Sequence, residues 1–212
     1  MYKLIYTIIL STISLLFLFS CSEEKTPVTE LSFNVDSTLL APENKFDSLG
    51  FRFNPPKNFD PISDSLFTEI QNNLLKMEEE SGEFSLDIIN IFLHDSTKSF
   101  CSISQLQIKD SEGSLNSIMP QYRNYLEKKL SGLSVTMADF MKDNIHMYQF
   151  LIQGPDRIQF KLDFMTIKDI IIQIDFVVPK NDYEKMVQSI ESSIGSINLL
   201  INNLRSSVWS NK

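Results

Sequence analysis

The two cysteines and two histidines of this 212-residue sequence are the side chains best suited to nucleophilic catalysis or zinc binding. They are Cys21, His94, Cys101 and His146, and their spacing matches neither C-x-x-C nor H-x-x-x-H, the short spacings that zinc sites use. The sequence also lacks G-x-S-x-G and the glycine-rich loops that hold phosphate. We therefore expect no metal, no cofactor and no catalytic residue, and we do not expect an enzyme.

Cys21 directly follows an apolar run, which suggests a different use for its thiol. The run from Leu4 to Phe19 is interrupted only by hydroxyl residues and is preceded by Lys3, as in a secretory signal peptide. A transmembrane helix is the alternative, but such a helix requires about 20 apolar residues. We expect residues 1–20 to be a signal peptide.

Leu18, Phe19, Ser20 and Cys21 together resemble the lipobox of bacterial lipoproteins, although Phe19 is bulkier than the residue usual there. The resemblance implies that Cys21 receives a diacylglycerol by a thioether bond and that a lipoprotein signal peptidase cleaves between Ser20 and Cys21. The new amine would then be acylated, for example with palmitate. An ordinary signal peptide that happens to contain a cysteine is the alternative.

Lipidation of Cys21 would leave Cys101 as the only thiol, so no intramolecular disulfide could form. We expect Cys101, in a strand-like stretch, to be buried and unreactive. Lys3 is the only charged residue before Cys21, so the processed chain would carry 18 basic and 27 acidic residues, a net charge of −9. This charge disfavours nucleic acid and anionic headgroups as partners, and we assign membrane attachment to the acyl chains alone.

These features predict a lipid-anchored protein of the cell envelope. Ser22 stands where an aspartate would favour the inner membrane, so the outer membrane is preferred. Glu23 and Glu24 resemble acidic signals for export to the cell surface, which leaves the periplasmic face and the surface both open.

The chain divides into a signal peptide (1–20), a lipidated flexible tether (21–47), one domain (48–205) and a C-terminal tail (206–212). The tether is rich in polar residues and proline, and the domain is long enough to bury one full core. Hydrophobic periodicity predicts strands near Phe51 and at 86–94, 99–108, 134–142, 144–153, 158–164 and 170–178, with helices at 63–79, 115–130 and 183–197.

The expected fold is α+β, with a single, mainly antiparallel sheet of about six or seven strands between helices. The last two strands should form a hairpin around residues 167–169, with apolar Ile158, Phe160, Leu162 and Phe164 facing inward. The alternating Gln159, Lys161 and Asp163 should partly face water. The first helix should pack through Phe67, Ile70, Leu74 and Met77.

Two segments carry a family resemblance. "GFRFNPPKNF" is similar to the opening strand, proline and aromatic residue of the superfamily of PsbP, Ran-binding Mog and DcrB proteins, although Phe59 replaces a frequent tryptophan. "IDFVVPKNDYEKMVQSIESSIGSI" is similar to its final strand and helix. The resemblance implies an α/β/α sandwich and transfers no catalytic residue.

The favoured function is a non-enzymatic interaction or assembly module with a protein partner in the envelope. A carrier of a lipid or other apolar ligand, held between helix and sheet, is the alternative. A hydrolase is the least favoured and would need polar groups gathered near His94, His146 or Cys101.

Overall fold

The computed structural model describes residues 28–78, 83–109 and 113–200. In chain order the elements are η2 (Ser37–Leu39), β1 (Asn44–Phe46), β2 (Phe51–Phe53), β3 (Asp60–Pro61), α2 (Asp64–Glu78), β4 (Phe84–His94), β5 (Ser99–Ile108), α3 (Leu115–Lys129), β6 (Ser134–Lys142), β7 (Ile145–Gln153), β8 (Arg157–Met165), β9 (Ile171–Pro179), η3 (Lys180–Asp182), α4 (Tyr183–Gly195) and β10 (Asn198–Leu199). Each helix and strand expected from the sequence is present.

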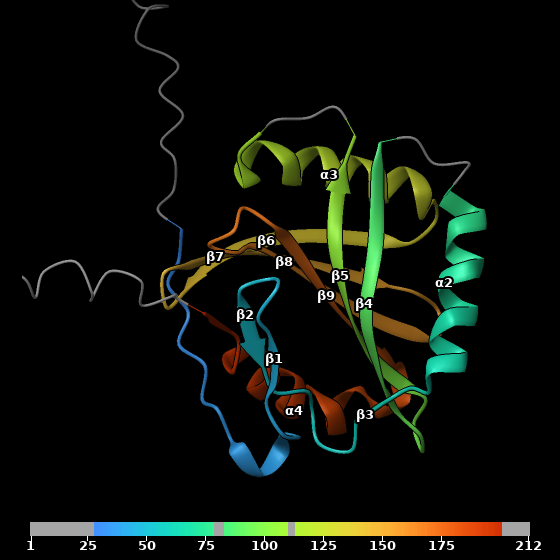
Figure 1. Cartoon of the computed structure of the whole chain (residues 1–212), viewed down its shortest axis with the longest axis vertical. Coiled ribbons are helices and arrows are strands. Elements are labelled where there is room, and N and C mark those ends of the chain that lie inside the picture. Colours follow the sequence, from blue (N-terminus) through green and yellow to red (C-terminus); the bar gives the residue numbers. More distant parts are fainter. Residues whose placement is uncertain (1–27, 79–82, 110–112, 201–212) are drawn as a thin grey trace, which may run out of the picture.

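Seven strands form an antiparallel sheet in the order β3-β4-β5-β9-β8-β7-β6 (Figure 1). Short hairpin turns set the register of its second half. Asp143 and Asn144 have φ angles of 47° and 67°, the left-handed pair that a two-residue type I′ turn requires between β6 and β7. Asp169, with a φ of 58°, lies in the turn between β8 and β9, where the hairpin was expected.

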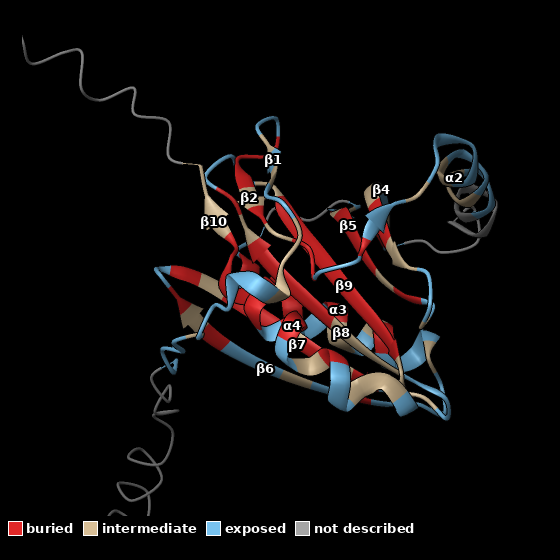
Figure 2. Ribbon diagram, turned by 90° about the horizontal axis from the view of Figure 1, so that it is seen from below, coloured by how far each residue is buried: buried red, intermediate tan, exposed pale blue. Residues whose placement is uncertain are grey.

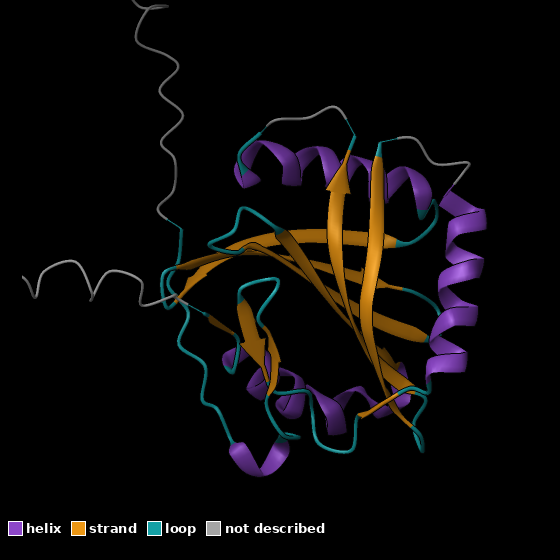
Figure 3. Ribbon diagram, in the orientation of Figure 1, coloured by secondary structure: helices purple, strands orange, loops and turns teal. Residues whose placement is uncertain are grey.

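Two apolar cores lie on opposite faces of this sheet, and both are contained in residues 28–200. Helix α4 covers one face with β2, and Phe53 and Ile190 are buried there. Helix α3 covers the other face through Tyr122 and Leu126 (Figures 1 and 3). This arrangement confirms the expected α+β class with helices on both sides of the sheet.

A second, three-stranded sheet of order β1-β2-β10 was not expected. We placed the strand near Phe51 in a single sheet, whereas β2 pairs antiparallel with β1 and with β10. Phe51 and Phe53 point into the core from β2 and are fully buried. The small sheet therefore acts with α4 as a cover for one face of the large sheet.

The assignment of residues 28–47 to a tether is wrong, because this segment packs on the domain. Leu31 N donates to Met141 O and Met141 N donates to Thr29 O, which attaches the segment to β6. Phe33 lies 5.8 Å from the Phe140 ring. A Cβ at Gly195 would lie only 2.7 Å from Phe33 Cβ, so glycine allows the segment to approach α4.

The apolar side chains described on helix α2 belong to neither core, contrary to the expectation for Phe67 and Ile70. Phe67 and Ile70 are only half-buried, and Leu66 is 40% exposed. Figure 2 shows α2 standing beside β4 at the edge of the sheet rather than over a face. Gln71 Nε2 donates to Ile88 O of β4 at 3.1 Å. Side chains 74–78 of this helix are outside the described residues, so the expectation for Leu74 and Met77 is untested.

No helix in the described part of the chain is both long enough and apolar enough to span a membrane. The described residues do not include the expected signal peptide (1–20), the end of the expected domain (201–205) or the expected tail (206–212).

Candidate functional site

Ser20 and Cys21, the residues expected to be processed and lipidated, lie outside the described residues, and their roles stay predictions. Cys101 is fully buried on β5, as expected. Burial raises the pKa of its thiol well above the ordinary value, and the Asp175 charge raises it further. The thiol is therefore held in the unreactive, protonated form.

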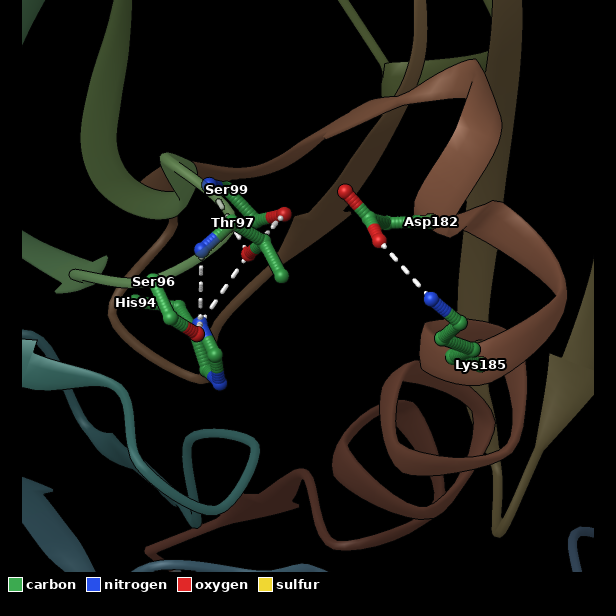
Figure 4. A network of polar contacts seen from close by, with 6 residues as sticks. All are labelled: His94, Ser96, Thr97, Ser99, Asp182 and Lys185. Carbon is green, nitrogen blue, oxygen red and sulfur yellow. Dashed lines mark hydrogen bonds and ion pairs between the residues drawn. The ribbon is translucent and has the colours of Figure 1, made fainter.

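His94 takes part in a local turn network between β4 and β5 (Figure 4). Its Nδ1 lies 3.2 Å from Ser96 Oγ and 3.0 Å from Thr97 Oγ1, and Thr97 N donates to it at 3.3 Å. Thr97 Oγ1 in turn donates to Ser99 Oγ at 2.8 Å. All these partners lie within five residues of His94, so the network stabilises the turn between β4 and β5.

His146 on β7 has an orienting partner on the neighbouring strand, which its sequence position alone does not reveal. Its Nε2 lies 2.9 Å from Asp139 Oδ2 on β6, and its ring centroid lies 4.8 Å from that of Tyr148. Strands β9 and β8 separate β7 from β5, which places His146 about 14 Å across the sheet from the strand of Cys101. The structure therefore does not bring His146 and Cys101 together.

Within the described ranges, no three His, Cys, Asp or Glu residues are grouped so that they could hold a metal ion. The polar residues that do converge lie under α3, in the middle of the large sheet. We refer to them as the buried polar cluster, which consists of Ser102, Ser104, Tyr122, Lys161, Asp163, Gln173 and Asp175.

Strand register builds the buried polar cluster as two rows across three strands. Ser104 on β5 lies opposite Gln173 on β9, which lies opposite Asp163 on β8. In the next row, Asp175 lies between Ser102 and Lys161. Residues directly opposite in adjacent strands share a face, so both rows point toward α3.

Asp175 is the centre of the hydrogen bonds in this cluster. Lys161 Nζ donates to its two oxygens at 2.8 and 3.0 Å, and Gln173 Nε2 donates at 2.7 Å. Gln159 Nε2 adds a fourth bond at 3.1 Å. Tyr122 OH donates to Gln173 Oε1 at 2.6 Å, which connects α3 to the sheet. The charges of Lys161 and Asp175 are thus paired in a largely dry environment.

Asp163 differs from its neighbours because both of its carboxyl oxygens lack a hydrogen-bond partner among the described residues. The residue is fully buried, and burial raises its pKa well above the ordinary value. Lys161 lowers this pKa and Asp175 raises it. The net direction is upward, so the protonated, neutral form is favoured.

This shift gives a pH-dependent prediction for Asp163→Asn. The unfolded carboxyl titrates near pH 3.9, so above about pH 4 the folded state binds more protons than the unfolded state. The contribution of Asp163 to stability is therefore lost as pH rises from about 4 through the raised pKa, by up to about 1.4 kcal/mol per unit for one proton. Asparagine removes this titration, and the variant should exceed wild type in stability at pH 7 but not at pH 4. Urea unfolding across this range measures the difference, and a difference that is constant with pH would contradict the assignment.

Gln159, Lys161 and Asp163 were expected on a face partly exposed to water, and this expectation is wrong for Lys161 and Asp163. Lys161 is 6% exposed and Asp163 is fully buried, because α3 covers this face. The expected turn at 167–169 already places Lys161 opposite Asp175, so the sequence could have predicted that these two residues face each other. A complementary charge pair at facing positions is unusual for two strands that simply face water.

A cavity of about 230 Å³ lies beside this cluster, between α3 and the sheet. Its walls are mainly apolar and come from β4, β5 and α3, including Phe84, Ile88, Leu106 and Leu126. Gln159, Lys161 and Tyr122 line the cavity and are also part of the hydrogen-bonded group around Asp175. Lys129 lines it from the last turn of α3. The arrangement can hold a small apolar group against a polar floor.

The large antiparallel sheet, with α3 on one face and α4 on the other, defines the protein as α+β. No protein-family model matches the sequence, and neither does any curated protein. The solution structure of cyanobacterial PsbP (CyanoP) from Synechocystis sp. PCC 6803 is similar with a TM-score of 0.50 and 10% identity, over 86% of this chain and 98% of that one. The crystal structure of the Saccharomyces cerevisiae Ran-binding protein Mog1p gives a TM-score of 0.44 and 8% identity, over 80% and 97%.

The likeness to CyanoP shows that this chain has a PsbP-like fold, which confirms the fold implied by "GFRFNPPKNF" and by the final strand and helix. At this identity the likeness concerns the fold alone. A fold of this kind does not by itself determine a function.

Proposed function

We propose that this protein is a lipoprotein of the cell envelope, anchored in the outer membrane by lipid on Cys21, and that its PsbP-like domain is a non-enzymatic module that binds another protein. The apolar run that ends at Phe19 and the lipobox-like Leu18 to Cys21 support the anchor. The acidic chain supports attachment through acyl chains rather than through headgroup binding.

The observation that carries the interaction role is the exposed apolar side of α2. Leu66 is 40% exposed, and Phe67 and Ile70 are half-buried at the side of β4. None of these three residues belongs to the two buried cores found in the described part of the chain. An apolar helix surface next to a sheet edge is typical of a protein–protein contact.

Negative charge placed on this surface tests the interaction role. Leu66→Glu with Ile70→Glu should reduce recovery of the bound protein at least tenfold in affinity capture from detergent-solubilised membranes, because central apolar contacts each contribute more than about 1 kcal/mol to binding. Asn72→Glu with Asn73→Glu is the matched control, since both residues are exposed on the same helix.

The control should retain the wild-type partner at the wild-type level. Equal recovery of that protein by both double variants would contradict a role for α2. A wild-type chain that captures no protein above an unrelated lipoprotein would contradict the interaction module itself.

A second function, a carrier of an apolar ligand, is favoured by the cavity between α3 and the sheet. Native mass spectrometry of the chain from Ser22 to Lys212 tests it, because this chain contains both apolar cores. Co-purification or uptake of an apolar molecule would support the carrier. A chain that takes up none would exclude it.

A further inference from the structure

The cavity between α3 and the sheet has a charge that is opposite to that of the protein as a whole. The chain carries a net charge of −8, with 27 acidic and 19 basic residues. The described residues that line the cavity include two lysines, Lys129 and Lys161, and no carboxylate. Asp175 pairs with Lys161, so Lys129 supplies the positive charge that a ligand would meet inside the mainly apolar walls.

The two lysines occupy different positions relative to the ligand space. Lys161 is 6% exposed and directs two hydrogen bonds to Asp175, so its charge is largely neutralised by that partner. Lys129 is exposed in the last turn of α3, and its Nζ lies 2.9 Å from Tyr125 OH and 5.3 Å from the centre of the Tyr125 ring. Lys129 has no carboxylate partner within the described ranges, so it brings an unpaired charge to the outer end of the cavity wall.

The size of the cavity limits the apolar part of the ligand. At about 30 Å³ for one water-sized group in a liquid, a volume of about 230 Å³ holds roughly eight such groups. A long diacyl lipid is too large, whereas a short alkyl chain or one aromatic ring fits. Tyr125, Phe84 and Leu106 offer aromatic and aliphatic contacts to such a group.

We infer that the cavity binds a small amphipathic acid, such as a medium-chain fatty acid, with the alkyl chain between Phe84 and Leu106 and the carboxylate at Lys129. This inference rests on the carrier function and specifies its ligand. Charge complementarity distinguishes the acid from a neutral molecule of the same length, because Lys129 can donate to a carboxylate.

Calorimetric titration of the chain from Ser22 to Lys212 with octanoate and with octanol tests the inference. We expect octanoate to bind about fivefold more tightly than octanol, because an ion pair at a partly exposed site contributes about 1 kcal/mol to binding. Lys129→Met should remove this preference by weakening octanoate about fivefold, with octanol within twofold of wild type. Lys128→Met, on the same helix turn but outside the cavity lining, should change neither value.

A pocket-filling variant locates the site independently of charge. Ile88→Trp, at a half-buried position of β4 that lines the cavity, should weaken both ligands at least tenfold while the unfolding temperature stays near that of wild type. Equal affinity for octanoate and octanol, or equal effects of Lys129→Met and Lys128→Met on octanoate, would overturn the acid as ligand but leave the carrier intact. Binding of neither molecule at millimolar concentration would overturn both.

Discussion

Asp175→Ala is expected to lower the free energy of unfolding by about 3–5 kcal/mol, the range for removing one partner of a buried ion pair. The carboxylate of Asp175 accepts four hydrogen bonds, two of them from Lys161, and both side chains are 8% exposed. Alanine would leave the Lys161 ammonium buried without a counter-charge. Urea unfolding followed by circular dichroism measures the loss.

Two further variants separate the buried pair from a general effect of mutation. Glu127→Ala breaks the ion pair with Arg123 on α3, whose side chains are 42% and 43% exposed, and should cost less than about 0.5 kcal/mol. Lys161→Met combined with Asp175→Leu removes both charges and should recover most of the stability lost in Asp175→Ala. A cost for Asp175→Ala as small as that for Glu127→Ala would contradict the proposed role of the pair.

Cys21→Ala is expected to abolish lipid attachment completely and to leave the protein as an uncleaved precursor. The thiol is the acceptor of the diacylglycerol, and the lipoprotein peptidase acts on the lipid-modified form. Metabolic labelling with radioactive palmitate measures the first effect, and gel mobility measures the second. Cys101→Ala is the matched control and should keep wild-type labelling, because Cys101 is buried in the folded domain.

Replacement of residues 1–21 by a cleavable secretory signal complements this test. The chain should then be released in soluble form, because the acidic protein offers no second anchor. A Cys21→Ala protein that still incorporates palmitate and reaches mature size would show that the lipobox assignment is wrong.

The sequence predicted the large sheet well because its signals are local. Alternation of apolar residues identifies β8 and β9, and the Asp143–Asn144 turn has the residue types that a left-handed conformation tolerates. The same local reasoning failed for the segment that precedes β1. Phe33 contacts Phe140 and fits over Gly195, and such contacts between distant parts of the chain leave no periodic pattern in a short stretch.

The candidate site was predictable only in part, for a related reason. The turn at 167–169 was expected, and it fixes Lys161 opposite Asp175. Whether that face of the sheet is covered depends on how α3 packs, which period-two alternation cannot specify. The position of α2 was missed because its apolar spacing matches that of a core helix, although the sheet offers its faces to α3 and α4 instead.

The attachment of residues 29–31 to the edge of β6 limits how far the domain can move from a membrane. A free tether from Cys21 to Asp47 could extend to about 90 Å. Because the chain is attached to β6 from Thr29 onward, only the stretch from Cys21 to Val28 is left, and it spans at most about 25 Å. A lipid on Cys21 would therefore hold the β6 edge close to the bilayer. Helix α2 lies beside β4, five strand spacings or about 24 Å across the sheet from β6. The lipidated segment would therefore reach the domain at one edge of the sheet, whereas the exposed helix α2 lies at the other. This arrangement would let α2 face away from the lipid surface and contact proteins that approach from the aqueous side.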